Sequence, residues 1–244
     1  MIVYRPATRS EPAESASSLT EVRTVGISPL GLPGNLRIPA GADLLVVFAH
    51  GSGSSRLSPR NMAVADGLNA QGMATLLFDL LTSEEEADRA NVFDIPLLAG
   101  RVVDAVDWIS HEPLTRNLRL GLFGASTGAA AALVAAARLG DRVGAIVSRG
   151  GRPDLAGDVL DQIYTPTLLI VGGVDYVVIE LNEQALARLR GPKALEIIPG
   201  ASHLFPEPGA LESVIDHAAR WFLRYLGSHL TSPRACSNGM VCHG

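Results

Sequence analysis

Short, continuous apolar runs recur along the chain and are separated by longer segments of mixed polarity. An apolar run of about five residues bounded by turn residues is typical of a strand that is buried on both faces of a parallel sheet. The runs occupy Leu44–Ala49, Ala74–Phe78, Leu118–Phe123, Val143–Val147, Thr167–Val171 and Ala194–Ile198.

The segments between these runs carry the periodicity of helices with one apolar side. They are Ser58–Asn69, Asp94–Ser110, Ala129–Leu139, Asn182–Leu189 and Pro208–Tyr225, with a shorter helix toward Ile163. Ahead of them, Glu21–Ile27 alternates like an edge strand, and Asn35–Pro39 would complete a hairpin. Strands that alternate with helices predict an α/β fold, with a mostly parallel sheet covered by helices on both faces.

The same pattern indicates one domain over residues 21–226, without internal repeats. Residues 1–20, rich in Ser, Glu, Ala and Pro, and residues 227–244 are expected to be flexible segments. The charged stretch Glu84–Asn91 reads as an exposed excursion between a strand and a helix.

Composition narrows the classes of function. Charged residues make up 18% of the 244 residues and the formal net charge is −5, which argues against a nucleic-acid partner. No apolar run approaches the roughly 18 residues of a membrane span, and the first residues lack the apolar region of a secretory signal. Cys236 and Cys242 both lie near the end of the chain, so the body holds no disulfide and no cysteine nucleophile, as expected of a cytoplasmic protein. Two cysteines and one neighbouring histidine are too few to predict a metal site, and no metal is expected.

A candidate for chemistry lies within Leu118–Leu139, which reads LRLGLFGASTGAAAALVAAARL. An apolar strand breaks at Gly124-Ala125-Ser126-Thr127-Gly128 and continues as an Ala-rich helix. Strand, glycine-flanked serine turn and helix form the layout of a nucleophile elbow. The glycine spacing does not match the G-x-G-x-x-G of a dinucleotide-binding turn, so no nucleotide cofactor is predicted.

Two more polar residues follow later strands. Asp175 comes after the run that ends at Val171, and His203 after the run that ends at Ile198. Because the carboxyl ends of parallel strands share one edge of the sheet, Ser126, Asp175 and His203 are expected to meet there. Serine needs a base to take its proton, histidine titrates near neutral pH, and an aspartate can orient the imidazole. Asp154 and Asp158 are rival acids, but they follow the preceding strand.

The chain order Ser126, Asp175, His203 is one of the known orders of a serine, acid and histidine triad. On this ground residues 21–225 resemble the α/β-hydrolase superfamily, and the GASTG elbow resembles its dienelactone-hydrolase-like branch. The resemblance implies a hydrolase that needs no cofactor. Dienelactone hydrolases proper carry cysteine at the elbow, whereas this chain has Ser126, so general ester hydrolysis is the better expectation than a dienelactone substrate. Some members of the branch are fused to phosphoribosyltransferase domains, and none is recognised here.

The tetrahedral oxyanion needs two donors. The backbone N–H of Thr127 is the first, and by analogy with His-Gly-x loops of the superfamily Ser52 supplies the second. His50, the first residue of that loop, reads as structural. Arg56, Arg149 and Arg152 are candidates for binding a substrate carboxylate, or they pair with nearby aspartates.

The connection from Arg149 to Pro166 is too short to hold a cap domain, which predicts an open site for small esters or lactones. The alternatives on this fold are hydrolysis of another acyl bond (an amide or a thioester) and perhydrolysis. A non-catalytic small-molecule binding protein is the alternative of another class, since fold does not dictate function. The expected partner is a small-molecule ester, and the expected state is a monomer or homodimer.

Overall fold

The computed structural model describes residues 20–227. The segments expected to be flexible, and the cysteines Cys236 and Cys242, therefore lie almost entirely outside the described residues. Within them, eight strands form one sheet in the order β1-β2-β4-β3-β5-β6-β7-β8. The strands are β1 (Glu21–Ile27), β2 (Leu32–Ile38), β3 (Leu44–Ala49), β4 (Ala74–Phe78), β5 (Arg119–Ala125), β6 (Ala145–Arg149), β7 (Thr167–Gly172) and β8 (Lys193–Ile198).

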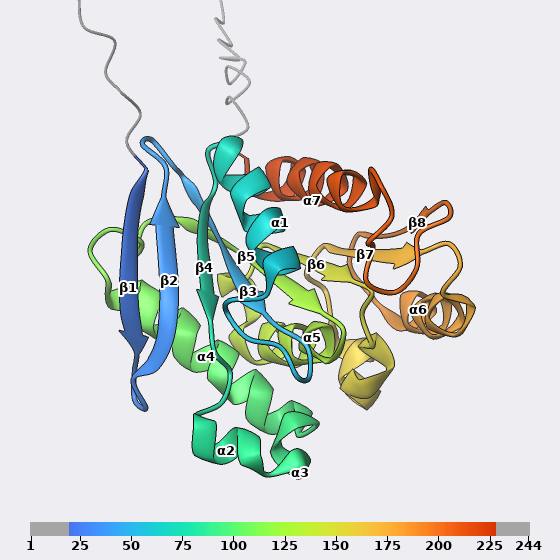
Figure 1. The fold of residues 1–244 in the computed structure, drawn as a ribbon, viewed down its shortest axis with the longest axis horizontal. Helices are drawn as coiled ribbons and strands as arrows, with labels where there is room; N and C mark the ends of the chain where they lie inside the picture. Colours follow the sequence, from blue (N-terminus) through green and yellow to red (C-terminus); the bar gives the residue numbers. More distant parts are fainter. Residues whose placement is uncertain (1–19, 228–244) are drawn as a thin grey trace, which may run out of the picture.

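The sheet is parallel from β4 to β8, and only β2 runs antiparallel to its neighbours β1 and β4. Helices α1 (Pro59–Ala70) and α7 (Ala210–Leu226) cover one face (Figure 1). Helices α4 (Ile95–His111), α5 (Thr127–Leu139) and α6 (Tyr176–Arg188), with the 3-10 segment η2 (Pro153–Gln162), cover the other. This is the predicted α/β-hydrolase architecture, and the short β6–β7 connection holds η2 in place of a cap domain.

Local signals in the sequence explain where the helices begin. Ser58 caps α1, with its hydroxyl accepting the N–H of Asn61, and Pro59 fills the first helical position, where no N–H is needed. The predicted excursion after β4 is built from the short helices α2 (Ser83–Ala87) and α3 (Arg89–Val92). Thr82 and Glu85 form a capping box at the start of α2. A three-residue 3-10 turn, η1 (Gly140–Arg142), follows α5. Among the described residues, no helix is long and apolar enough to cross a membrane.

Several boundaries differ from the sequence prediction. Strand β2 begins at Leu32 rather than Asn35, and β5 ends at Ala125 rather than Phe123. Helix α6 begins at Tyr176 rather than near Asn182. The prediction missed this start because Tyr176 and Val177 are exposed apolar residues, which obscure the helical periodicity. Strand β6 is shifted by two residues and ends at Arg149, which was expected in a loop. Buried arginine is rare enough in strands that its position could not be read from the pattern.

Candidate active site

Ser126 lies at the junction of β5 and α5, on a strained backbone. Its φ of 52° and ψ of −123° lie in a region that residues with a side chain rarely adopt. The glycines on either side explain how strand and helix approach so closely. A Cβ on Gly124 would lie 2.4 Å from Cα of Ala129, and one on Gly128 would lie 2.2 Å from the carbonyl oxygen of Ala49. The elbow therefore exists because both positions lack a side chain.

Hydrogen bonds from the end of β6 hold the main chain of Ser126 on both sides. Its N–H donates to the carbonyl oxygen of Arg149 at 3.2 Å, and its carbonyl oxygen accepts the N–H of Arg152 at 3.0 Å. The loop after β3 (residues 50–55, called the β3 loop below) passes directly against the serine, since a Cβ on Gly51 would lie 2.9 Å from Cβ of Ser126. The position of the serine is thus fixed by backbone contacts from two neighbouring loops.

His203 and Asp175 form a hydrogen-bonded pair at the same edge of the sheet. Nδ1 of His203 and Oδ2 of Asp175 are 2.6 Å apart, which leaves Nε2 of the imidazole for another partner. The turn after β6 runs beside this histidine, because a Cβ on Gly150 would lie 3.6 Å from its Cε1. Strands β5, β6, β7 and β8 thus bring Ser126, Asp175 and His203 to one edge.

The rival acids have other partners. Asp154 forms a two-pronged ion pair with Arg152, with distances of 2.8 and 2.7 Å. Asp158 contacts Arg188 at 3.3 Å on the surface. Neither is positioned by a hydrogen bond to His203 among the described residues, whereas Asp175 is.

Ser52 and Thr127, the residues expected to stabilise an oxyanion, are in contact. The backbone N–H of Ser52 donates to the side-chain hydroxyl of Thr127 at 2.9 Å. Thr127 is the first residue of α5 and is only 4% exposed. The hydrogen bond joins the β3 loop to the elbow helix, and it gives the Ser52 N–H a partner within the protein.

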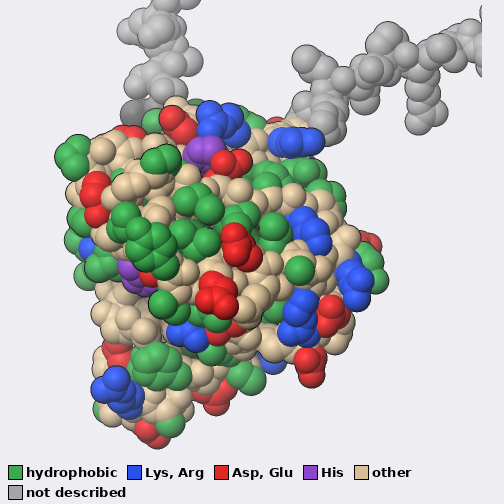
Figure 2. Space-filling model, turned by 90° about the vertical axis from the view of Figure 1, so that its right-hand side faces the viewer, with side chains coloured by type: hydrophobic (Ala, Val, Ile, Leu, Met, Phe, Trp, Pro, Cys, Tyr) green, Lys and Arg blue, Asp and Glu red, His purple; other side chains and the backbone are tan. Residues whose placement is uncertain are grey.

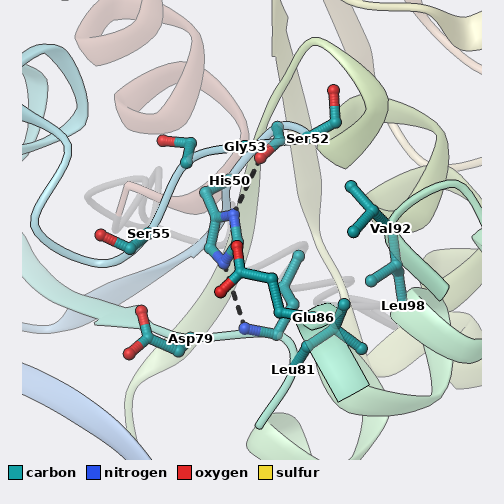
Figure 3. A pocket seen from close by; sticks show the side chains of 12 residues that line it. His50, Ser52, Gly53, Ser55, Asp79, Leu81, Glu86, Val92 and Leu98 are labelled. Carbon is teal, nitrogen blue, oxygen red and sulfur yellow. Dashed lines mark hydrogen bonds between the residues drawn. The ribbon is translucent and has the colours of Figure 1, made fainter. Parts of the chain in front are cut away.

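His50 connects the β3 loop to the loop after β4 (Figure 3). Its Nδ1 lies 3.0 Å from the carbonyl oxygen of Gly51, and its Nε2 accepts the N–H of Leu80 at 3.1 Å. Nε2 can accept only when the ring is neutral, with its proton on Nδ1. Burial lowers the pKa of His50, which favours that neutral form. His50 is therefore a structural residue of the loop.

The three candidate arginines are paired or buried. Arg56 pairs with Asp79, which also accepts the Arg56 backbone N–H at 2.7 Å, and Asp154 raises the pKa of Arg152 by hydrogen bonding. Arg149 is 6% exposed, and its Nε and Nη1 have no hydrogen-bond partner among the described residues. Burial, with a smaller contribution from the nearby charge of Arg60, lowers the pKa of Arg149 to about 10. These contacts favour the pairing interpretation for Arg56 and Arg152.

Two cavities border the β3 loop. The smaller, shown in Figure 3, has a volume of about 30 Å³ beside His50, which is room for one or two water molecules. The larger has a volume of about 390 Å³ and lies between Ser52-Gly53 and the α2–α3 segment. Its other lining residues are Glu86, Ala87, Arg89, Val92 and Phe93. The sequence predicted an exposed excursion here but did not identify Val92 and Phe93 as lining a cavity.

Exposed apolar residues flank the Asp175–His203 pair in the chain. Val174, Tyr176 and Val177 are 46%, 75% and 72% exposed, and Leu204 is 44% exposed. Hydrophobic side chains gather among charged ones on the face of the molecule shown in Figure 2. Tyr176 and Val177 were missed because the helix was predicted to begin after them, although a run of apolar residues next to a candidate acid was visible in the sequence.

Comparison with known proteins agrees with the fold. The model of the dienelactone hydrolase family matches residues 36–224. The chain belongs to the dienelactone hydrolase family. The crystal structure of a dienelactone hydrolase from Anabaena variabilis is 56% identical, with a TM-score of 0.81, over 85% of this chain and 98% of that one. The esterase Est1E of Butyrivibrio proteoclasticus shares the fold at 17% identity, with a TM-score of 0.69, over 84% of this chain and 98% of that one.

A Mycobacterium tuberculosis protein that is named as a phosphoribosyl transferase is 57% identical to this chain over 206 residues. The match covers 84% of this chain but 46% of the relative. The chain thus spans about half the length of the curated relatives it matches.

Proposed function

We propose that this member of the family is a cofactor-independent serine hydrolase of short carboxylic esters or lactones. The observation that carries the proposal is the 2.6 Å hydrogen bond between His203 and Asp175 at the sheet edge where Ser126 stands on its strained turn. A carboxylate on Nδ1 fixes the imidazole tautomer that leaves Nε2 as a base. The esterase structures among the relatives agree with an ester substrate.

In the proposed mechanism, His203 removes the proton of the Ser126 hydroxyl as its oxygen attacks the acyl carbon. The tetrahedral intermediate collapses when the protonated His203 gives its proton to the leaving alcohol, and an acyl-enzyme remains. Water, deprotonated by the same histidine, then attacks the acyl carbon. The second tetrahedral intermediate collapses when the protonated His203 returns that proton to Oγ of Ser126, which releases the acid and regenerates the serine. Asp175 stabilises the imidazolium in both halves of the reaction.

The architecture supports a small substrate. Within residues 20–227 no cap domain covers the site, and the cavity beside Ser52 is about 390 Å³, which is at the low end of ligand pockets. Val92 and Phe93 give this cavity an apolar wall that suits a short acyl or alcohol group. Arg89, which stacks over Phe93 at 5.9 Å, would bound it on the solvent side.

The transferase name of the tuberculosis relative does not change the proposal. The described residues form the hydrolase fold, and 54% of the relative lies outside the match, since the match covers 46% of it. We assign the hydrolase activity to the matched part and the transferase name to the remainder of the relative. A nucleotide-dependent reaction at Ser126 has no support from the glycine spacing of the elbow.

The proposal is tested with p-nitrophenyl acetate and butyrate, together with labelling by a fluorophosphonate. Turnover is expected from the wild-type protein and none above background from Ser126→Ala, while Asp175→Asn lowers kcat by about 10⁴-fold because it supports the wrong tautomer. Ser110→Ala, at an exposed serine on α4, is the matched control and should match the wild type. A wild-type protein that cleaves no short ester or lactone and leaves Ser126 unlabelled would contradict the proposal.

A further inference from the structure

Asn182 is a fully buried polar residue on a helix that is otherwise mostly exposed or partly buried. Helix α6 buries three of its 13 residues, Val178, Asn182 and Ala185, and Asn182 is 0% exposed. Burying a side-chain amide costs free energy unless the amide is hydrogen-bonded, and apolar residues are the usual occupants of a buried strip. The contacts of Asn182 explain why an amide occupies this position.

The Asn182 amide joins α6 to the turn that follows β6 (residues 149–152, called the β6 turn below). Its Nδ2 donates to the carbonyl oxygen of Gly151 at 3.0 Å and to that of Val178, one helical turn earlier, at 2.7 Å. The bond to Val178 stays within α6, whereas the bond to Gly151 spans 31 positions of the chain. Helix α6 also lies beside η2, the segment that continues from the β6 turn (Figure 1). Asn182 therefore attaches the β6 turn to the helix.

The β6 turn contacts both the proposed nucleophile and the proposed base. Arg149 and Arg152 hold the main chain of Ser126 through the two hydrogen bonds described above. Gly150 packs against His203, since a Cβ on this glycine would lie 2.9 Å from the histidine carbonyl oxygen and 3.6 Å from its Cε1. The φ of Gly150 is 50°, which residues with a side chain rarely adopt. A shift of the turn would therefore disturb the surroundings of Ser126 and of His203 together.

Helix α6 carries the third member of the proposed triad. Asp175 is the N-cap residue of α6, and Asn182 follows seven residues later. Seven residues make about two helical turns, so both positions lie on a similar side of the helix. Asp175 reaches His203 at 2.6 Å from the start of α6, and Asn182 reaches Gly151 at 3.0 Å from two turns further on. The helix is thus tied to the site at two points.

We propose that Asn182 is a positioning residue, which holds the β6 turn against α6 and so keeps Ser126 and His203 in register with Asp175. The proposal rests on the proposed ester hydrolysis, and Asn182 acts through the turn without touching the substrate. A misplacement of about 1 Å by a residue far from the chemistry can cost about 10²-fold in rate. Without the Asn182 amide, the Gly151 carbonyl oxygen loses this donor and the turn is free to shift relative to α6.

Asn182→Leu tests the proposal because it keeps a similar volume and removes the donor. We expect kcat for p-nitrophenyl butyrate to fall about 10²-fold per active site, while KM changes less than about threefold. Active sites are counted by the final fraction of protein that a fluorophosphonate labels at Ser126. A purely structural role would lower the number of active sites or the midpoint of thermal unfolding and leave kcat per site unchanged. An unchanged kcat per site overturns the proposal.

Asn69→Leu is the matched control. Asn69 lies on α1, which covers the other face of the sheet, and its Nδ2 also donates to a backbone carbonyl oxygen, that of Met73, at 2.8 Å. This variant should be less stable than the wild type and keep the wild-type kcat per active site. Equal losses of kcat in Asn69→Leu and Asn182→Leu would indicate a general loosening of the fold and would overturn the proposal.

Asn182→Ser covers the case in which the leucine variant does not fold. A serine inside a helix can donate to the carbonyl oxygen four residues earlier, here that of Val178, but its side chain is too short to replace the bond to Gly151. We expect a loss of kcat per active site similar to that of Asn182→Leu. A wild-type kcat in the serine variant would show that the bond to Gly151 positions nothing, and it would overturn the proposal.

Failure of this proposal can be told apart from failure of the proposed function. A wild-type protein that is labelled at Ser126 but hydrolyses no short ester contradicts the proposed substrate. The labelling rates then test the positioning role: a rate about 10²-fold slower in Asn182→Leu supports it, and an unchanged rate overturns it. A wild-type protein that is neither labelled nor active overturns both proposals, whereas an active wild type with an unimpaired Asn182→Leu overturns the positioning role alone.

Discussion

The elbow on one side of the β3 loop and the α2–α3 segment on the other are built in different ways. At the elbow, backbone packs on backbone, and the first ten residues of α5 are all buried. The α2 and α3 helices contribute no buried residue, and they are held by caps and by partly buried ion pairs such as Arg101–Glu85 at 2.6 Å. Caps and ion pairs that are open to solvent on one side each stabilise by about 1 kcal/mol, so this segment is the more tolerant of change.

This difference separates the residues proposed to carry out the reaction from the residues proposed to contact the substrate. Any side chain added at the elbow meets backbone atoms that cannot move independently, so the groups proposed to do chemistry are fixed by the fold. Side chains of α2 and α3 form the wall of the 390 Å³ cavity that lies opposite Ser52, and they can be replaced without disturbing the core. We expect substitutions on the two sides to affect stability and specificity, respectively.

The largest effect is expected at Gly128. Gly128→Ala would place a methyl group 2.2 Å from the Ala49 carbonyl oxygen and 2.5 Å from that of His50. Because backbone would have to shift, the free energy of unfolding should fall by about 3 kcal/mol or more, as measured by urea denaturation. Gly100→Ala is the matched control: its new methyl group meets only the far end of Arg138 at 4.0 Å, so the substitution should be neutral or stabilise by about 0.5–1 kcal/mol. Similar results for both variants would contradict the close packing at the elbow.

A smaller effect, confined to specificity, is expected at Val92. Val92→Trp fills part of the cavity beside Ser52, so kcat/KM for p-nitrophenyl butyrate should fall about tenfold relative to acetate. The midpoint of thermal unfolding should change little, because Val92 is only partly buried on a short exposed helix. Equal losses for both esters, or a large loss of stability, would remove the proposed division between the two regions.

The smallest effect is expected from His50, which lies where the two regions meet. Burial lowers its pKa in the folded protein, so between the ordinary histidine value of about 6.5 and that lower value only the unfolded chain takes up the proton. Its contribution to stability is therefore present above about pH 6.5 and is lost as the pH falls below it. The free energy of unfolding should drop more between pH 7 and pH 5 in the wild type than in His50→Gln. Parallel pH profiles for the two proteins would contradict this role.

Periodicity and strand order were sufficient to predict the sheet, the longer helices and the elbow, but not the short helices α2 and α3 or the start of α6. The apolar runs identified all six parallel strands, because parallel strands covered on both faces leave a signal that exposed helices do not. Five of the six are buried as predicted, whereas β8 at the edge of the sheet is mostly only partly buried, with Ile198 its one buried residue. The order of Ser126, Asp175 and His203 was enough to predict that they share one edge, and the 2.6 Å hydrogen bond between the last two is what that prediction requires.

Contacts between distant residues could not be predicted in the same way. The hydrogen bond between Ser52 and Thr127 joins residues 75 positions apart, and nothing in either local pattern indicates it. The burial of Arg149 was missed for a related reason, since an arginine at the end of a strand usually reaches water. The cavity walls at Val92 and Phe93 depend on how the α2–α3 segment folds back toward the β3 loop, which is decided by tertiary packing.

The backbone angles of Ser126 restrict which nucleophiles this scaffold could ever accept. A positive φ costs every side chain something, but it is worst for residues that branch at Cβ, so threonine is excluded at this position on steric grounds alone. Serine, cysteine and aspartate all carry a single heavy atom on Cβ, and each could occupy the same turn without altering it. A single substitution of serine by cysteine at this position is therefore compatible with the fold. Whether the new nucleophile is active would depend on the neighbouring base.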